Sequence, residues 1–567
     1  RRCSVRNQPL IVLKFGGSVL LDAQRLRVAV HEIYRWRRDG YRVLAVVSAL
    51  SGRTESLLDL CTSSLGEVSD LEQASLLAAG ELESASLLGK QLDRAGIPAS
   101  VLTPDRVGLV ASGDPLDADL VSVKCEPIRA ALEADGVVVF PGFVAIDSQG
   151  NTVTLGRGGS DLTAIFLADC LNAECCRLIK DVDGLYDRDP AIKSNVTRRY
   201  AHAGYDEALQ TDGSIIQYKA VRFAKRHACQ FELGRFNGIR PTTIGIGDAV
   251  IENAPDVPSI LRIALCGYGT VGSGVFELVN QLPELFEITG VACRTPEKHP
   301  DKSRVLTDDA AALSASSADI VVEVIGGIEL PMEIAQNALS KGSHFVTANK
   351  ALIAQHGETI DQLAQQYARR VLASASVGGG VPVLESLRDG QVRSVRGVLN
   401  GTGNYVLGAH EQGVSLHEAI HKAQELGFAE ADPSRDLDGN DSLDKLLVIA
   451  QTLGWSIPTG AISTESITDS SNSQLGNGTT KHIALVTQEL AQVKVEQVDP
   501  TSVLGQLKNE WNAAIIEFED GTSSIVRGKG AGCWPTSESV IADLLELSRY
   551  ECSKKSSKED CYDQAFS

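Results

Sequence analysis

Asp441 and Lys445 are four residues apart in "LGFAEADPSRDLDGNDSLDKLL" (426–447), a spacing that puts two side chains on one face of a helix. Glu430 and Asp436 lie on the loop before that helix. A lysine beside carboxylates suits carbonyl reduction, in which a cofactor donates hydride and the protein delivers a proton to the new alkoxide. The simpler alternative is an exposed helical ion pair with no chemical role.

A glycine-rich turn supplies a place for such a cofactor. In "LRIALCGYGTVGSGVFELV" (261–279), Gly267, Gly269 and Gly272 have the GxGxxG spacing between a strand and a helical pattern, with Thr270 and Val271 inside the turn. This context predicts a dinucleotide-binding site. The next strand, in "ITGVACRTPEK", is followed by no acid that would bind a ribose 2′-hydroxyl. Arg294 and Lys298 lie there instead, which favours NADP over NAD.

Three earlier segments have residues suited to phosphate. "LKFGGS" places Lys14, Gly17 and Ser18 at the end of an apolar strand, where glycines let backbone amides approach an anion. "LGRGGSDLTA" (155–164) repeats the glycine pair, and "KDVDGLYDRDP" (180–190) adds an acid-rich turn after a strand. Each segment alone is consistent with an ordinary turn. Together, in this order, they indicate a nucleotide site.

The elements that must position these residues alternate between short apolar runs and longer helical patterns. The alternation in residues 10–250 predicts a mostly parallel sheet covered by helices. After the polar stretch "IENAPDVPSI" a second βαβ pattern begins at Leu261 and continues to about residue 395, followed by a mixed region. We therefore expect an α/β chain: a parallel-sheet sandwich, then a Rossmann dinucleotide-binding domain with an α+β domain.

Composition excludes several partners. The 567 residues carry a formal net charge of -20, which repels nucleic acid and anionic membranes. The chain has no apolar run long enough to span a bilayer, and its 12 cysteines have no metal-binding or disulfide pattern. We expect a cytoplasmic location or an organelle stroma. Because the chain begins without Met, we expect its true amino terminus to be missing.

Residues 10–247 resemble the amino-acid kinase family and, within it, the aspartokinases, through the three phosphate-type segments and "VVSALSGRTESLL", "GELESASLL" and "FPGFVAID". The resemblance implies that Lys14 is catalytic and binds ATP. It implies further ATP contacts at Gly17, Ser18, Gly159, Ser160, Asp161, Thr163, Asp181 and Tyr186, and aspartate contacts at Ser48, Thr54, Glu81 and Arg157. ATP would be bound with Mg²⁺.

The kinase-like half departs from this pattern at three positions. Lys180 stands where aspartokinases usually have a small hydroxyl residue, Ser214 replaces a lysine that relatives use near the nucleotide, and Ala191 replaces an arginine. Two hypotheses follow: either both halves are catalytic, or the kinase-like half is a degenerate scaffold for a working dehydrogenase. A kinase for another small acid is a third, more remote one.

Residues 261–549 resemble homoserine dehydrogenase, through the glycine-rich turn, "VVEVIGG", "TANKALIAQHG", "SASVGGGVPVLESL", "GVLNGTGNYVL", the 426–447 segment and "GKGAGCWPTSESVIADLLEL". The resemblance implies that Lys445 is the proton donor and that Lys350 lies near the carbonyl and the nicotinamide. Glu430, Asp436 and Asp441 would hold the substrate, and Gly326 and Gly532 would contact the cofactor. It also implies a Na⁺ or K⁺ site formed by the backbone at Val377, Gly379 and Val381, although Ser374 replaces a glutamate common there.

The whole chain thus resembles the bifunctional aspartokinase/homoserine dehydrogenases. Their substrates would be aspartate, aspartate semialdehyde and homoserine, and a homodimer or homotetramer is expected. Only thirteen residues separate Gly247 from Leu261, too few for the regulatory ACT domains that such enzymes carry there. The predicted domains are a kinase-like domain (1–250), a linker (251–260), an NADP-binding domain (261–395), a substrate and dimerisation domain (396–527), a return to the cofactor domain (528–550) and a polar tail (551–567).

Overall fold

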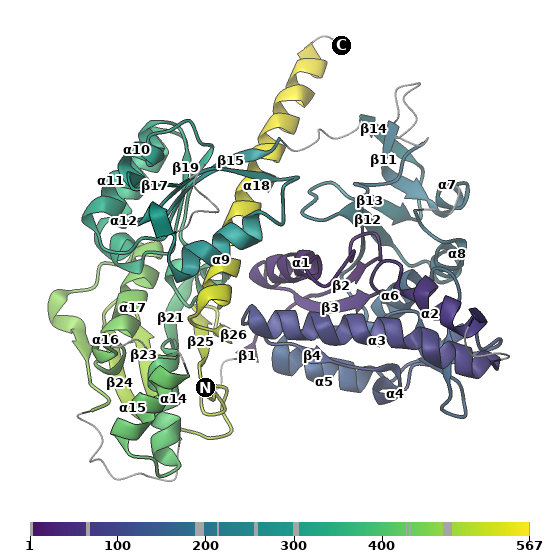
Figure 1. Ribbon diagram of the computed structural model, residues 1–567, viewed down its shortest axis with the longest axis horizontal. Helices are drawn as coiled ribbons and strands as arrows, with labels where there is room; N and C mark the ends of the chain where they lie inside the picture. The colour runs from purple at the N-terminus through teal and green to yellow at the C-terminus, as the bar shows by residue number, and fades with distance from the viewer. Residues whose placement is uncertain are drawn as a thin grey trace. The chain divides into compact units, whose positions relative to one another are not determined.

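The computed structural model describes residues 4–63, 68–187, 198–211, 215–253, 259–298, 306–426, 428–429, 432–468 and 479–565. Figure 1 labels many of its helices and strands. Two compact units divide the chain. Unit 1 comprises Arg1–Asn7, Arg94–Ile97 and Pro258–Ser548, and unit 2 comprises Gln8–Asp93, Pro98–Val257 and Arg549–Ser567.

The larger sheet of unit 2 has the strand order β14-β11-β13-β12-β10-β2-β3-β7-β4 over the described residues. Its strands are β2 (Leu10–Phe15), β3 (Arg42–Val47), β4 (Ser100–Val101), β7 (Val137–Pro141), β10 (Cys175–Lys180), β11 (Arg198–Gly204), β12 (Phe231–Arg235), β13 (Thr242–Gly245) and β14 (Val250–Asn253). The central pairs β12-β10-β2-β3-β7 are all parallel. Runs such as "LIVLKF" and "VVVFP" suit this position because parallel strands are covered on both faces.

A smaller sheet and a set of helices complete unit 2. The small sheet has the order β6-β5-β8-β9. Its strands are β5 (Val110–Ser112), β6 (Asp119–Ser122), β8 (Val144–Ile146) and β9 (Thr152–Thr154). The helices are α1 (Leu26–Arg38), α2 (Arg53–Ser63), α3 (Asp70–Arg94), α4 (Pro104–Val107), α5 (Cys125–Asp135), α6 (Gly159–Leu171), α7 (Tyr205–Leu209) and α8 (Tyr218–His227).

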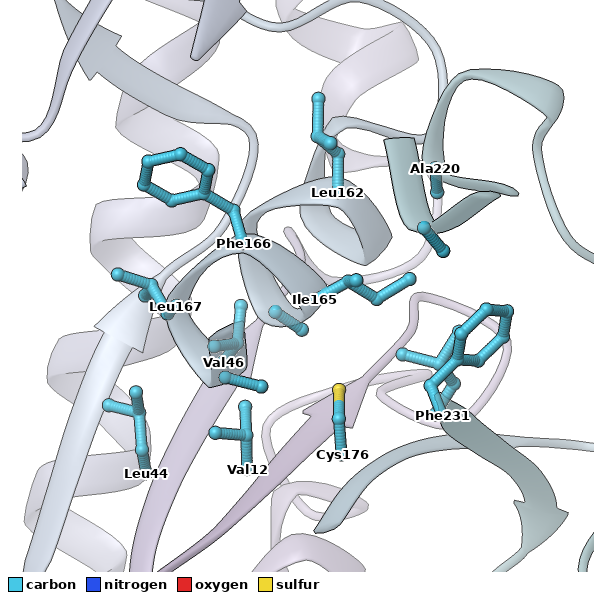
Figure 2. Packing of buried hydrophobic residues seen from close by; sticks show 14 of the residues in the cluster. Val12, Leu44, Val46, Leu162, Ile165, Phe166, Leu167, Cys176, Ala220 and Phe231 are labelled. Carbon is cyan, nitrogen blue, oxygen red and sulfur yellow. The ribbon is translucent and has the colours of Figure 1, made fainter. Parts of the chain in front are cut away.

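Helix α6 forms the centre of the core of unit 2. Its side chains Ile165 and Leu167 lie among Val12 and Val46 of the neighbouring strands β2 and β3, as Figure 2 shows. All four side chains are buried. Most of α6 is buried, and apolar packing against β2, β10 and β3 is the main contribution to its position.

The first sheet of unit 1 is entirely parallel, with the order β17-β16-β15-β18-β19-β20 in the described part of the chain. Its strands are β15 (Leu261–Cys266), β16 (Phe286–Ala292), β17 (Leu306–Thr307), β18 (Ile320–Glu323), β19 (His344–Thr347) and β20 (Val371–Leu372). The helices that connect them are α9 (Thr270–Val279), α10 (Ala310–Ser314), α11 (Glu329–Ser340) and α12 (Lys350–Gln366). The predicted Rossmann arrangement is confirmed.

The second sheet of unit 1 is mixed, with the order β1-β26-β25-β21-β23-β24-β22. Its strands are β1 (Ser4–Val5), β21 (Val392–Val398), β22 (Ile462–Thr464), β23 (Thr479–Val486), β24 (Ala491–Val498), β25 (Trp511–Phe518) and β26 (Thr522–Lys529). Its helices are α13 (Val383–Ser386), α14 (Gly401–Glu411), α15 (Leu416–Glu425), α16 (Ser434–Leu437) and α17 (Asn440–Thr452), followed by α18 (Cys533–Ala565). This is the α+β region expected after residue 396.

Three segments differ from the sequence-based boundaries. The predicted linker contains most of β14, which pairs antiparallel with β11 and so extends the larger sheet of unit 2. The first residues of the chain belong to unit 1, because β1 pairs with β26. The predicted polar tail is helical to Ala565, drawn in yellow in Figure 1. Lys554 supports that helix through Glu551, at 3.5 Å, and the ring of Tyr550.

Candidate active sites

Asp441 and Lys445 lie on one buried face of α17. The Nζ of Lys445 is 2.8 Å from Oδ2 of Asp441 and donates a hydrogen bond of 2.5 Å to the carbonyl of Leu399. Asp441 is 8% exposed and Lys445 is 6% exposed. The burial of both groups excludes the alternative of an exposed helical ion pair.

Lys350 reaches the same carboxylate from a different element. It is the first residue of α12, and its Nζ contacts Oδ1 of Asp441. Burial tends to raise the pKa of Asp441, but Lys445 and Lys350 outweigh this and hold the pKa far below its usual range. Asp441 is therefore ionised at physiological pH and positions both ammonium groups.

Asn400 belongs to this cluster although the sequence gave no reason to single it out. Its Nδ2 donates to Asp436 at 2.7 Å and to Asp441 at 2.9 Å, and its Oδ1 accepts from the amide of Gly403 at 2.7 Å. Asn400 thus caps α14 while it bridges two acids. Burial raises the pKa of Asp436. The signal that could have found Asn400 is a helix-capping residue directly after the strand in "GVLNGTGNYVL". Glu430 lies outside the described residues.

The glycines of the GxGxxG turn have the separate tasks that dinucleotide binding requires. Gly267 has φ +114°, and a Cβ there would lie 2.7 Å from the carbonyl oxygen of Val324. A Cβ at Gly272 would collide with the carbonyl of Gly267. At Gly269 nothing lies within 4 Å of the Cβ position, so a ligand has access to the backbone there. Thr270 and Val271 begin α9.

Glu323 organises a second glycine loop. The sequence analysis predicted Gly326 of this loop as a cofactor contact but did not single out Glu323. This fully buried carboxylate at the end of β18 accepts hydrogen bonds from the amides of Ile325, at 2.7 Å, and Gly326, at 3.3 Å. Its other oxygen accepts from the hydroxyl of Thr347 at 2.6 Å. Gly326 has φ +86°, with nothing within 4 Å of its Cβ position. The loop therefore presents open backbone next to the first glycine turn.

The same carboxylate connects that loop to the start of α12. The hydroxyl of Thr347 accepts from the amide of Asn349 at 3.0 Å. The side chain of Asn349 donates to the carbonyl of Gly327 at 2.7 Å and caps α12, whose first residue is Lys350. Burial raises the pKa of Glu323. A single buried acid thus fixes both the glycine loop and the helix that carries Lys350.

The carboxyl-terminal return also reaches the dinucleotide turn. The thiol of Cys533 donates to the carbonyl of Thr270 at 3.0 Å, and the hydroxyl of Ser537 donates to that of Val271 at 3.1 Å. Gly532, with φ +112°, directly precedes α18.

Arg294 is exposed just after β16, and no ion pair to it occurs among the described residues. The side chain of Lys298 lies outside them.

The segment expected to hold a monovalent cation is buried and has an unusual backbone. Val377 and Val381 are buried, and Gly379 has φ +54°. The carbonyl of Gly379 accepts from the hydroxyl of Ser539, and that of Val381 accepts from the amide of Val383 at 2.8 Å. A carbonyl oxygen has two lone pairs, so each keeps one for a cation. Among the described residues, no group of three or more His, Cys, Asp or Glu side chains could hold a metal ion.

In unit 2, Lys14 and Lys180 share one carboxylate. Lys14 is near the end of β2, Lys180 ends β10, and Asp161 lies in the first turn of α6. The Nζ of Lys14 is 2.7 Å from Oδ1 of Asp161, and the Nζ of Lys180 is 2.9 Å from Oδ2. Burial tends to raise the pKa of Asp161, but the two lysines lower it to about 2. Burial lowers the pKa of Lys14 to about 8.

Glu81, on α3, is a buried acid of the same unit. It is 3% exposed, and its Oε2 has no hydrogen-bond partner among the described residues. Burial raises its pKa to about 7, against the opposing effects of the Ala49 backbone and of Lys14. A buried oxygen without a partner is costly, so this position suits a ligand that brings a donor.

The remaining residues expected around ATP and aspartate occupy the surrounding turns. Gly17 and Ser18 follow β2, Ser48 follows β3, and Thr54 is in the first turn of α2. Gly159 and Ser160 begin α6, and Arg157 is exposed just before it.

The Thr163 hydroxyl donates to the Gly159 carbonyl at 2.9 Å and accepts from the Phe143 amide. Tyr186 donates to Asp183 at 2.7 Å, and Asp181 is exposed. Ser214 and Ala191 lie outside the described residues.

The parallel sheet, the glycine turn and the Lys350–Asp441–Lys445 cluster define unit 1 as a dinucleotide-dependent oxidoreductase. Residues 267–374 match the NAD-binding domain of homoserine dehydrogenase, and residues 382–545 match homoserine dehydrogenase itself. The chain belongs to the homoserine dehydrogenase family. Residues 9–231 match the amino acid kinase family, so the chain also carries a kinase domain.

Individual relatives divide between the two halves. The homoserine dehydrogenase of Pseudomonas aeruginosa is 32% identical over 51% of this chain and 72% of its own length. The aspartate kinase of Pseudomonas fluorescens is 34% identical over 38% of this chain, which spans 54% of that relative's length. A crystal structure of a homoserine dehydrogenase from Thiobacillus denitrificans is 27% identical with a TM-score of 0.48, covering 52% of this chain and 74% of that one. The sequence matches to both enzymes favour two activities over a degenerate scaffold.

No helix in the described part of the chain is long and apolar enough to cross a membrane.

Proposed function

We propose that unit 1 reduces L-aspartate 4-semialdehyde to L-homoserine with NADPH, and that unit 2 phosphorylates L-aspartate with ATP to give 4-phospho-L-aspartate. The main support for the first activity is that Lys350 and Lys445 share the carboxylate of Asp441. The observation that carries the second is the cluster of Lys14 and Asp161 at the strand ends. Degeneration of the kinase half is the competing hypothesis.

In the reduction, the residues of unit 1 bind the substrate and deliver a proton. Bound NADPH supplies the hydride. Lys445 gives a proton from Nζ to the oxygen that becomes the hydroxyl group, and Lys350 polarises that oxygen. Asp441 orients both ammonium groups. Asp436, together with Glu430, holds the substrate ammonium. Burial raises the pKa of Asp436, and the bound ammonium would lower it again by stabilising the carboxylate.

The glycine loops and the start of α18 support the proposed cofactor site. Gly269 and Gly326 leave the space at their Cβ positions open, which fits a pyrophosphate close to the backbone. Gly532 and Lys298 would complete the site, and the exposed Arg294 would bind the 2′-phosphate. The carbonyls of Val377, Gly379 and Val381 would hold Na⁺ or K⁺.

In the phosphorylation, the attacking β-carboxylate of aspartate is ionised at neutral pH, so no general base is required. Its oxygen forms a bond to the γ-phosphorus, and the bond to the bridging oxygen breaks, leaving ADP. Lys14 neutralises charge on the phosphoryl oxygens, and Mg²⁺ bound with ATP would supply further positive charge there. Glu81 would hold the substrate ammonium, and Arg157 with Ser48 and Thr54 the α-carboxylate.

Two assays on the intact chain test the proposal. Oxidation of NADPH with aspartate semialdehyde measures the first activity. For the second, aspartate, MgATP and hydroxylamine are incubated with the protein, and the hydroxamate formed from the acyl phosphate is measured together with ADP. Reduction without hydroxamate would replace the two-enzyme proposal by the scaffold hypothesis. Absence of reduction would contradict the assignment of unit 1.

The proposal extends to assembly and location. A homodimer or homotetramer in the cytoplasm or an organelle stroma is expected. Light scattering after size-exclusion chromatography measures the oligomeric state. A monomer that retains full dehydrogenase activity would contradict it.

A further inference from the structure

Unit 2 holds a second, largely shielded lysine, Lys180, that none of the roles above uses. The side chain of Lys180 is 12% exposed, compared with 6% for Lys14 and 3% for Asp161. Both oxygens of Asp161 accept from Lys180, at 3.1 and 2.9 Å. The question is whether Lys180 only stabilises the fold or takes part in the chemistry.

Sheet register explains why the two lysines meet. Strands β2 and β10 are parallel neighbours, and Lys14 is paired with Leu178. Side chains alternate along a strand, so Lys180, two residues after Leu178, projects from the same face as Lys14. Both lysines are at the carboxyl ends of their strands, where parallel sheets place their ligands. Lys180 therefore projects toward the place expected for the transferred phosphoryl group.

The charge of the cluster is unbalanced. Two ammonium groups and one carboxylate give a net charge of +1 in a region that is almost fully buried. A buried net charge is unfavourable unless an ion of opposite sign approaches it. Asp161 is in the first turn of α6, a helix of 13 residues, whose amino-terminal amides also favour an anion. Glu81 also interacts electrostatically with Lys14, but burial raises its pKa to about 7, which weakens it as a balancing carboxylate near neutral pH.

We propose that Lys180 is a catalytic residue of the kinase, binding the transferred phosphoryl group jointly with Lys14, while Asp161 positions the two ammonium groups. As the substrate oxygen bonds to the γ-phosphorus and the bond to ADP breaks, negative charge persists on the phosphoryl oxygens and increases on the departing bridging oxygen. Two ammonium groups on one side of this centre stabilise that charge in place, with no proton transferred. The inference rests on the proposed kinase function and adds a residue to it.

The test compares Lys180→Met, which removes the charge and keeps the length, with Lys180→Arg, which keeps the charge. The matched control is Lys225→Met, because Lys225 also pairs with one aspartate, Asp206, but in an exposed position in the same unit. We measure hydroxamate formation, and binding of MgAMP-PNP and MgADP by calorimetry. Lys180→Met should lower kcat about 10²-fold, as loss of one preorganised donor to a developing anion does. The substitution should weaken the binding of MgAMP-PNP much more than the binding of MgADP.

Lys180→Arg should recover most of the rate, and Lys225→Met should leave it unchanged. If Lys180→Met lowers the melting temperature but leaves kcat and the affinity for MgAMP-PNP at their original values, Lys180 has only a structural role and the proposal fails. If the unmodified protein forms no hydroxamate but binds MgAMP-PNP in a Lys180-dependent way, the kinase function fails while phosphate binding by Lys180 stands. Absence of nucleotide binding would overturn both.

Discussion

The Nζ of Lys445 lies 2.8 Å from Oδ2 of Asp441, one helical turn away, and both groups are buried. An ammonium held by a carboxylate and by the Leu399 carbonyl has a fixed direction, which a proton donor needs. The same pair would be a weak and mobile contact on an exposed helix.

Lys445→Met should therefore affect chemistry and leave cofactor binding intact. The alkoxide that Lys445 protonates exists only late in the reduction, so its loss should lower kcat by about 10²-fold or more, the range of general acid catalysis. The KM for NADPH should not change. Steady-state kinetics measure both, with Lys422→Met on the exposed side of α15 as the control. An unaltered kcat would remove Lys445 from the mechanism.

The sequence predicts some of this site well and some of it not at all. The i,i+4 relation of Asp441 and Lys445 is local, and so is the strand-turn-helix context of Gly267, so both were accessible from the pattern. Lys350 joins the cluster across 91 residues of sequence, a contact that only the fold creates. Asn400 reaches the Asp436 and Asp441 side chains, and Glu323 reaches the Thr347 hydroxyl, across contacts between segments far apart in sequence that residue type alone does not reveal. Lys180 was visible as a departure and Asp161 as an expected ATP contact, but the pairing of the two was not.

Glu323→Gln should impair the dehydrogenase although the side chain is assigned no contact with substrate. Replacing one carboxylate oxygen by an amide breaks the set of acceptors for Ile325, Gly326 and Thr347, and so loosens both the glycine loop and the start of α12. We expect a rise in the KM for NADPH together with a fall in kcat, with kcat/KM reduced about 10-fold or more, because small misplacements of reacting groups cost up to about 10²-fold.

The melting temperature and the circular dichroism spectrum of the variant report whether unit 1 is folded. Asp319→Asn is the matched control, because it alters an exposed pair with Arg262 on the neighbouring strand. A purely structural role for Glu323 would predict a lower melting temperature with unchanged KM and kcat.

The kinase should have a narrow pH optimum. Glu81 must be ionised to hold the substrate ammonium, and burial raises its pKa to about 7, so kcat/KM should fall as the pH drops below about 7. Lys14 must be protonated, and burial lowers its pKa to about 8, so kcat/KM should also fall as the pH rises above about 8. The free-enzyme profile of hydroxamate formation would be bell-shaped.

Glu81→Gln identifies the acid limb, because it should lower kcat/KM and remove the dependence below pH 7. A profile that stays flat from pH 6 to pH 9 for the unmodified chain would mean that neither group must change its charge to work.

Arg294 should make the dehydrogenase prefer NADPH to NADH. It is exposed after β16, at the place where the second strand of a dinucleotide-binding sheet meets the adenosine ribose, and no acid stands at the end of that strand as a partner for a free 2′-hydroxyl. A guanidinium binds a phosphate through two charge-assisted hydrogen bonds, and such bonds contribute about 1.5 to 3 kcal/mol each. Arg294→Ala should therefore raise the KM for NADPH about 10-fold or more and leave that for NADH nearly unchanged.

Arg262→Ala, which removes an exposed arginine already paired with Asp319, is the control and should keep the preference. Equal use of NADH and NADPH by the unmodified chain would show that the residues after β16 do not read the 2′-phosphate.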